Sequence, residues 1–275
     1  MSAPTRPSGS VPAQRARGRA RLAARRRGGA SVIADLHMSG SSKLLFPRSL
    51  SALQAVYLNS SGGVTGGDAF DISATAREGA HLALTTQAAE RVYRALPGET
   101  GRVDTRLVLE PGARLDWLPQ ETILFDGAAL DRRLSVEMAP DARLLLCEPL
   151  IFGRAAMGES VTDLRHADRI DISRGGQLIW SDRLRLSGNA AAHLADPAIA
   201  DGARAMATVV LAARGAAAQV EPLRAMLPET AGVSAPGPDL LVLRMLAIDG
   251  FELRRHLCPI LRRLSGAELP RPWMI

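Results

Sequence analysis

The 275-residue sequence has few of the residues that hold metals or cross-link small folds. Its two cysteines, Cys147 and Cys258, lie far apart in apolar runs, so they form neither a disulfide framework nor a zinc-ligand spacing, and we expect buried thiols. The five histidines are scattered, which argues against a tight transition-metal site. Aromatic residues make up only 4% of the chain, too few for a platform that stacks sugars or nucleobases.

Long apolar segments and catalytic signatures are absent as well. No apolar run approaches the ~20 residues that span a bilayer. The N-terminus lacks the uninterrupted apolar core of a secretory signal, so we expect a soluble, cytoplasmic protein without membrane partners. The patterns Gly-x-Ser-x-Gly and His-Glu-x-x-His do not occur. With 47% hydrophobic residues, the chain can nevertheless bury one substantial core.

Positive charge is concentrated at the N-terminal end. The net charge is +6, but eight arginines precede the first acidic residue, Asp35, and the rest of the chain has 26 basic and 28 acidic residues. From Arg15 to Arg21, arginine alternates with small residues, which is typical of a strand with one solvated face. Because no aromatic residues are interleaved, we expect no nucleic-acid binding. Residues 1–14, rich in Pro, Ser and Ala, are predicted to form a disordered leader.

A repeat of about 30 residues runs through the middle of the chain. Each copy has a turn dipeptide, a small residue, a polar residue and a leucine, preceded by an alternating run and followed by an apolar run. The copies are Glu78-Gly-Ala-His-Leu82, Pro111-Gly-Ala-Arg-Leu115, Pro140-Asp-Ala-Arg-Leu144 and Arg174-Gly-Gly-Gln-Leu178. This pattern predicts strand, tight turn, strand, stacked into a mostly antiparallel or coiled, β-solenoid-like body over residues 15–213.

The periodicity changes after about residue 203. Residues 215–227 are predicted to form a helix with Pro222 in its first turn or at a break, 229–238 a linker, and 240–248 a buried strand. Asp249 then N-caps a second helix with one leucine face. We therefore expect one domain, 15–275, whose portion 214–275 carries about two helices. The basic outer face predicted for the last helix consists of Arg254, Arg255, Arg262 and Arg263.

A glycine-rich loop, Asn59-Ser-Ser-Gly-Gly-Val-Thr-Gly-Gly-Asp68, joins two strand-like runs. Four glycines in six residues indicate positive φ angles or a close approach of the backbone to another group. No Gly-Lys-Ser/Thr follows the loop, so it is not a nucleotide P-loop. No helix pattern follows it either, so it lacks the helix N-terminus that holds pyrophosphate in dinucleotide folds. A tight structural turn and a functional loop both remain open.

Polar clusters interrupt the apolar strands at residues 85–94 and 115–125. Both clusters follow repeat turns, so we expect them at equivalent places in successive β-units, with Gln87, Gln120 and Glu121 lining one internal face. The alternative is that these side chains cap strand ends and satisfy buried backbone groups. A third cluster, 153–159, contains Glu159 and is predicted to be a surface turn.

Together these segments resemble the urease accessory protein UreD (UreH) family, from about Arg15 to the C-terminus. The resemblance is carried by the glycine-rich loop and by four further motifs. These are Thr85-Thr-Gln-Ala-Ala with Val92-Tyr-Arg94, Trp117-Leu-Pro-Gln-Glu-Thr-Ile123, Gly153-Arg with Met157-Gly-Glu159, and Pro270-Arg-Pro-Trp273. Two departures are Glu90-Arg91, where a small polar residue and Lys are usual, and Pro272, where a branched apolar residue is common. The first departure makes Glu90 and Arg91 poor candidates for a shared role.

The resemblance implies a non-enzymatic protein that joins UreF and the GTPase UreG on the urease apoprotein, where nickel is installed. It implies a mostly β fold, no tightly bound cofactor, and an internal passage for nickel in transit. On this basis Asp68 and Glu121 are the candidates for transient nickel contact. Gln87, Gln120 and Glu159 are candidates for polar lining, and the four arginines of the last helix for partner binding. The competing hypothesis is a β-solenoid carbohydrate-active enzyme with two facing carboxylates.

Overall fold

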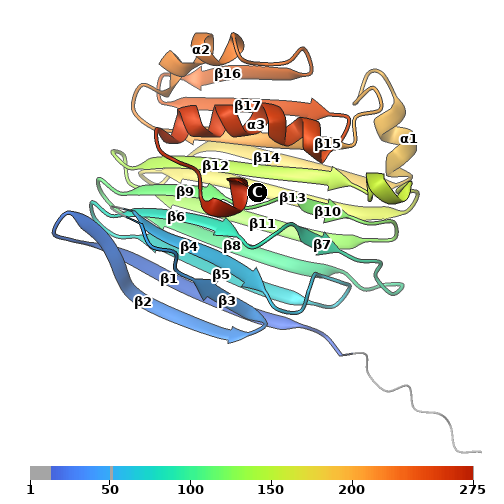
Figure 1. Cartoon of the computed structure of the whole chain (residues 1–275), viewed down its shortest axis with the longest axis horizontal. Coiled ribbons are helices and arrows are strands. Elements are labelled where there is room, and N and C mark those ends of the chain that lie inside the picture. The colour runs from blue at the N-terminus through green and yellow to red at the C-terminus, as the bar shows by residue number, and fades with distance from the viewer. Residues whose placement is uncertain (1–13, 50–51, 275) are drawn as a thin grey trace, which may run out of the picture.

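The computed structural model describes residues 14–49 and 52–274, and it consists of two β-sheets packed face to face (Figure 1). The seven-stranded sheet has the order β14 (Gln177–Gly188), β13 (Leu164–Arg174), β11 (Ala129–Met138), β8 (Gly101–Leu109), β5 (Ala69–Ala76), β1 (Arg17–Arg27) and β2 (Ala30–Gly40). Apart from Gln14, the predicted disordered leader lies outside the described residues. The mostly β, solenoid-like architecture is confirmed.

The ten-stranded sheet faces the first one along its length. Its main path is β16 (Ala231–Gly237), β17 (Leu240–Ala247), β15 (Ala205–Ala212), β12 (Arg143–Phe152), β9 (Arg114–Leu118), β6 (His81–Thr86), β4 (Leu53–Asn59) and β3 (Ser42–Leu45). Beside this path, β10 (Thr122–Leu124) pairs with β12 and with β7 (Glu90–Val92). The helices lie on or beside this sheet: α1 (Ala190–Ala195), α2 (Val220–Arg224), α3 (Gly250–Ser265) and the 3-10 turns η1 (Ala155–Met157), η2 (Ala216–Gln219) and η3 (Arg271–Met274).

The repeat turns connect the two sheets rather than forming hairpins. The strands β5, β8 and β11 belong to one sheet, and the strands β6, β9 and β12 that follow their turns belong to the other. Within each sheet these strands pair in parallel with the next coil. The hairpin interpretation is therefore correct only for the last repeat, where β13 pairs antiparallel with β14. The alternation of apolar and polar residues does not distinguish the two arrangements, because a strand that faces a second sheet shows the same inward–outward period as a strand in a hairpin.

Successive repeat turns stack on one another. The Gly79 amide donates to the Pro111 carbonyl (3.0 Å), and the Arg143 amide donates to the Ala113 carbonyl (2.9 Å). Gly79 and Gly112 have φ angles of 61° and 65°, which glycine adopts at little cost. The ~30-residue period thus corresponds to one coil of the solenoid, and each coil satisfies the backbone of its neighbour.

The main core lies between the sheets and consists largely of leucines that the repeats place at inward positions. A second core lies on the other face of the ten-stranded sheet, where α3 packs on β12, β15 and β17 (Figure 1). Strand β12 is buried on both faces, which explains its almost uninterrupted apolar sequence Arg143-Leu-Leu-Leu-Cys-Glu-Pro-Leu-Ile-Phe152. Cys147 is buried there, as predicted, and Cys258 is half-buried.

The second half of the chain confirms two predictions, corrects a third and adds one short helix that the sequence pattern does not predict. Asp249 caps α3 by accepting a hydrogen bond from the Glu252 amide (2.9 Å), and Pro222 lies in the first turn of α2. The predicted linker at 229–238 contains strand β16 instead, which the adjacent β17 stabilises by pairing. Helix α1, capped by Asn189, was not predicted because it is only six residues long. No helix within the described ranges is long and apolar enough to cross a membrane.

Candidate functional site

A small cavity of about 60 Å³, with mostly apolar walls, lies between the two sheets. Because each enclosed water molecule needs ~15 Å³ of cavity volume, the cavity has room for roughly four waters. Its apolar walls come from both sheets, and a small set of polar side chains also lines it: Thr86, Glu90, Thr105, Gln120, Thr122, Arg132 and Glu148. Thr86, Glu90 and Thr122 lie in β6, β7 and β10, and Gln120 lies between β9 and β10, so the two polar clusters of the sequence meet in one place. Strand β6 pairs with β9, and β7 pairs with β10, which confirms that the two polar clusters occupy equivalent places in successive β-units.

Arg132 is the central charge of the cavity wall. It projects inward from β11 and contacts Asp168, its register neighbour on β13, through Nε (3.1 Å) and Nη2. Across the gap, its Nη1 lies 2.6 Å from Glu148 and 3.2 Å from the Thr122 hydroxyl. Glu148 also accepts a hydrogen bond from the Trp117 indole (2.6 Å). This buried network links the two sheets through charged groups that satisfy one another.

The charge states of this network follow from burial and pairing. Burial opposes the positive charge of Arg132, but the adjacent Asp168 and Glu148 outweigh it and raise its pKa. Burial also opposes ionisation of Asp168, yet Arg132 holds the pKa of Asp168 below its usual value. For Glu148, burial prevails and raises the pKa despite Arg132. Arg132 and Asp168 thus form the firmly charged pair, and Glu148 is the carboxyl more readily protonated.

Glu90 faces the same cavity from the start of β7. Its Oε1 accepts a hydrogen bond from Asn59 Nδ2 (3.2 Å), which also donates to the Gly63 carbonyl (2.9 Å). Burial raises the pKa of Glu90 to about 7; the Asn59 hydrogen bond lowers it, and the charge of Asp68 raises it further. Glu90 therefore changes its charge near neutral pH at a position that lines an interior space.

We predict that Glu90→Gln stabilises the fold at pH 8 and has little effect at pH 4. In the unfolded chain Glu90 ionises near its ordinary pKa of ~4.5, whereas in the folded chain it does so near 7. The wild-type protein therefore loses stability between these two values, by at most ~3 kcal/mol, because the folded state holds the proton more tightly. Urea titrations at both pH values measure the difference. Glu137→Gln, which removes an exposed carboxylate on the outer face of β11, is the control for the loss of a surface charge.

The glycine-rich loop forms one end of the cavity. Val64 lines the cavity and is 1% exposed, and its amide and carbonyl pair with Arg91 and Tyr93 beside β7. Gly63, with a φ of 154°, permits this approach, since a Cβ there would lie 2.6 Å from the Arg91 carbonyl oxygen. Gly63, Val64 and Tyr93 also line a depression of about 460 Å³ on the outer side of the loop. The loop is thus a tight structural turn that also separates an interior cavity from the surface.

Asp68, the first predicted nickel-contact residue, holds this loop in place. One carboxylate oxygen accepts from the Ala16 amide (2.7 Å) and the other from the Thr65 amide (2.8 Å). The side chain is 5% exposed, so these amides replace the water it would otherwise bind. Asp68 acts as a loop cap, and its charge reaches Glu90 through space.

Glu121, the second predicted nickel-contact residue, adjoins Gln120, which lines the cavity, but does not line the cavity itself. Arg254 of α3 donates to Glu121 (2.9 Å) and to Gln120 (2.7 Å), and its guanidinium stacks 5.1 Å from the Trp273 ring centre. The Trp273 indole donates to the Leu118 carbonyl (2.9 Å). The motifs 117–123 and 270–273 therefore meet through α3. Arg254 points toward the sheet, so the prediction that all four helix arginines share one outer face is wrong for Arg254.

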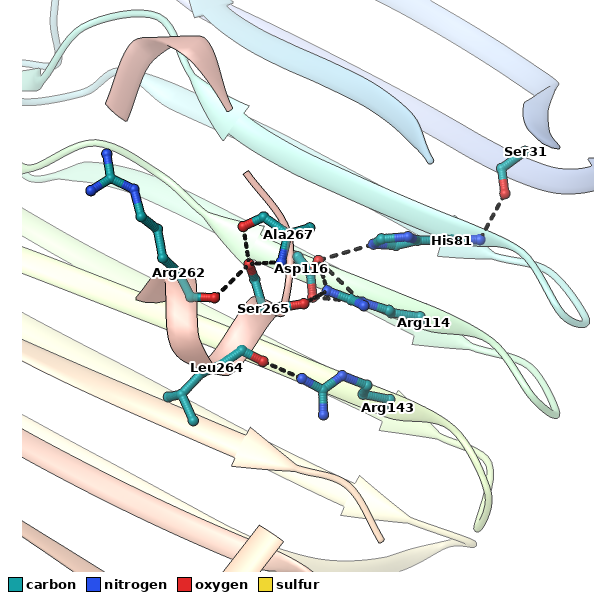
Figure 2. Close-up of polar contacts among 9 residues, drawn as sticks. All are labelled: Ser31, His81, Arg114, Asp116, Arg143, Arg262, Leu264, Ser265 and Ala267. Atoms are coloured by element: carbon teal, nitrogen blue, oxygen red, sulfur yellow. Dashed lines mark hydrogen bonds and ion pairs between the residues drawn. The ribbon is translucent and has the colours of Figure 1, made fainter. Parts of the chain in front are cut away.

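The opposite end of α3 is held by a second polar cluster (Figure 2). Arg114 and Arg143, adjacent in register at the start of β9 and β12, donate to the carbonyls of the last two residues of α3. Asp116 binds Arg114 (2.8 Å) and lies 2.9 Å from His81 Nε2. Burial opposes ionisation of Asp116, but His81 and Arg114 lower its pKa. Cations at a helix C-terminus complement its free carbonyls, so this cluster fixes α3 on the sheet.

The remaining predicted site residues lie apart from the cavity. Gln87 is exposed after the end of β6, so the prediction that it lines an internal face is wrong. Glu159 binds Arg154 (2.9 Å) within the surface turn 153–159, and this hydrogen bond lowers the pKa of Glu159 to about 2. Arg255, Arg262 and Arg263 are exposed on α3, as predicted.

Four charged residues of the cavity region were missed in the sequence: Glu90, Arg132, Glu148 and Asp168. A signal existed for Arg132, because it occupies an inward position in the alternation Leu130-x-Arg132-x-Leu134-x-Val136. Glu148 similarly interrupts an apolar run. Glu90 departs from the usual family residue, and this departure argued against a role for it. In the described part of the chain, no group of three or more His, Cys, Asp or Glu side chains is placed to hold a metal ion.

Comparisons with known proteins agree with this arrangement of motifs. The profile of the UreD urease accessory protein family matches residues 16–274. The urease accessory protein UreD of Ruegeria pomeroyi is 57% identical over 249 residues, covering 90% of this chain and 97% of the relative. That of Roseobacter denitrificans is 49% identical over 95% of this chain and 96% of the relative, and that of Methylobacterium sp. (strain 4-46) is 47% identical over 94% and 95%. This chain therefore belongs to the UreD family of urease accessory proteins.

Proposed function

We propose that this protein is a non-enzymatic scaffold for nickel insertion, which binds UreF and acts with the GTPase UreG on the urease apoprotein in the cytoplasm. The observation that carries the proposal is family membership over almost the whole chain, combined with an interior cavity that charged and polar side chains partly line. A scaffold needs rigid surfaces more than it needs a nucleophile. The two sheets, cross-linked by the Arg132 network and covered by α3, supply that rigidity.

We further propose that the cavity is part of the passage for nickel, which is cargo and not a resident cofactor. A carrier must release its ion, and scattered oxygen ligands suit release better than a Cys/His cage. Glu90 lines the cavity, whereas the side-chain oxygens of Gln120 and Thr122 accept hydrogen bonds from Arg254 and Arg132. The cavity has room for a cation with part of its hydration shell. In this proposal Asp68 and Glu121 lie outside the passage and act on the residues that line it. Asp68 tunes Glu90 through its charge, and Glu121 adjoins Gln120.

The proposed UreF-binding surface is the exposed basic face of α3. Arg255, Arg262 and Arg263 lie on its solvent side, whereas Leu253 and Leu257 are fully buried against the sheet. Because both ends of α3 are anchored, by Arg254 and by the Arg114 cluster, the helix can present these charges without ordering on binding. Arg254 is excluded from this surface because it pairs with Glu121.

The function is tested by complementation in a host whose own gene is deleted. We expect the deletion to abolish urease activity at limiting nickel and the wild-type gene to restore it. We reverse three charges together in the variant Arg255→Glu, Arg262→Glu, Arg263→Glu. In a pull-down it should retain less than about a tenth of the UreF that the wild-type protein retains, since charge reversal at an interface typically costs several kcal/mol of binding free energy. It should therefore complement poorly.

The triple variant Arg17→Glu, Arg19→Glu, Arg21→Glu, which reverses three exposed charges on β1, is the matched control and should behave as wild type. Normal urease activity in the deletion strain would refute the proposed function. Wild-type UreF retention by the α3 variant would refute the proposed surface alone.

The alternative function, a carbohydrate-active enzyme, requires two facing carboxylates in an open groove. The interior cavity holds roughly four waters, and Glu148 there is engaged by Arg132 and Trp117. The cavity therefore favours the passage of an ion over the binding of a sugar.

A further inference from the structure

The outer face of the seven-stranded sheet carries a dense set of arginines. Seven project from the outward positions of β8, β11, β13 and β14, against four carboxylates on the same positions. The basic residues are Arg102, Arg106, Arg133, Arg165, Arg169, Arg183 and Arg185, and the acidic residues are Asp104, Asp131, Glu137 and Asp171. This surface lies on the opposite side of the molecule from the core that α3 covers. We call these seven side chains the arginine face.

Strand register places three of these arginines side by side. Arg133 pairs with Arg169, and Arg169 pairs with Arg183, on three adjacent strands. Like charges directly opposite one another destabilise a sheet. Ion pairs offset this cost in part: the half-buried Asp131 lies 3.3 Å from Arg133 and 3.7 Å from Arg169, and Arg183 donates to both oxygens of Asp171 (2.8 and 2.9 Å). Two carboxylates thus serve three adjacent arginines, so the row keeps an excess of positive charge.

The arginine face is also hollowed. One depression of about 510 Å³ is lined by Arg106, Arg133, Arg169 and Arg183 together with Asp71, Asp104 and Asp171. An adjacent one of about 720 Å³ is lined by Arg165, Arg169, Arg183 and Arg185 together with Asp131 and Asp168. Arg169 and Arg183 belong to both, so the two depressions adjoin, and arginines outnumber carboxylates in each. Within the described residues, Arg185 takes part in no ion pair. Its guanidinium keeps its donors for a ligand.

We propose that the arginine face binds an acidic segment of a partner protein. Guanidinium groups form bidentate hydrogen bonds with carboxylates, and the excess of three positive charges gives the complementarity that steers such a segment to this face. Nucleic acid fits less well, because the outward positions of these four strands hold no aromatic residue for base stacking. This inference does not depend on the proposed function, and the surface is separate from α3.

The test uses fluorescence anisotropy with the full chain and a labelled peptide of about twelve residues that alternates Glu and Ser. We expect saturable binding that weakens as salt is raised toward physiological strength, where the Debye length falls to ~8 Å. The triple variant Arg169→Gln, Arg183→Gln, Arg185→Gln should weaken binding about tenfold, as expected for the loss of three charge-assisted contacts. Circular dichroism should show an unchanged fold, since all three side chains are exposed.

The control variant removes three exposed arginines elsewhere: Arg214→Gln, Arg224→Gln, Arg271→Gln. It has the same net charge as the test variant and should bind the peptide within about twofold of wild type, since screening limits long-range effects. An equal loss in both variants would show that binding reflects net charge alone, and it would overturn the proposal. A single-stranded oligonucleotide of similar length that binds more tightly, and loses its binding in the same test variant, would overturn it in favour of nucleic acid.

Discussion

Replacing Arg132 with methionine is expected to destabilise the fold by about 3–5 kcal/mol, because two buried carboxylates then lose their counter-charge. Arg132 is 9% exposed, and it contacts Asp168 on the neighbouring strand and Glu148 on the facing sheet. Methionine fills most of the same space, so the loss is chiefly electrostatic. The low pKa of Asp168 that Arg132 maintains should also rise.

Urea titration of the full chain measures this loss. The matched control is Arg133→Met, one position along β11, whose side chain is 56% exposed and should change stability by less than about 0.5 kcal/mol. Adding Glu148→Gln and Asp168→Asn to Arg132→Met should recover part of the loss, since neutral amides are less costly to bury than unpaired charges. Equal stability of the Arg132 and Arg133 variants would show that the buried network does not stabilise the fold.

Replacing Trp273 with alanine is expected to cost about 3–5 kcal/mol, the usual range for removing a buried aromatic side chain. Trp273 is 2% exposed, donates a hydrogen bond to the Leu118 carbonyl and packs under the Arg254 guanidinium. Its loss removes one wall of the Arg254 site, so the contacts of Arg254 with Gln120 and Glu121 should loosen as well. The change therefore weakens the attachment of α3.

Thermal unfolding gives the stability, and hydrogen exchange of the α3 amides reports on the helix itself. Met274→Ala, at the neighbouring and largely exposed position, should leave both unchanged. Trp273→Phe should recover the packing but not the hydrogen bond to Leu118, leaving a deficit of about 1 kcal/mol. Wild-type protection of α3 in Trp273→Ala would show that the leucine face alone holds the helix.

The candidate site was only partly predictable from sequence. Gln120 and Glu121 were identified because their motif interrupts an apolar strand, and both lie beside the cavity or its anchor. Gln87 was assigned to the same interior by analogy of position, but β6 ends at Thr86 and leaves Gln87 exposed. Glu90, which was set aside, instead faces the cavity. A one-residue difference in where a strand ends decides which side chain points inward.

The sequence by itself determined the repeat, the late change of period, the cap at Asp249 and the buried strands, because each depends on local turn chemistry or on hydrophobic periodicity. Only the tertiary structure decided that the repeat turns connect two sheets, since a hairpin and an arch between sheets share one alternation pattern. It also decided the partners of Arg132 and Arg254, which lie 16 or more residues away in sequence. Such partners depend on which coil stacks on which, and local sequence does not encode that.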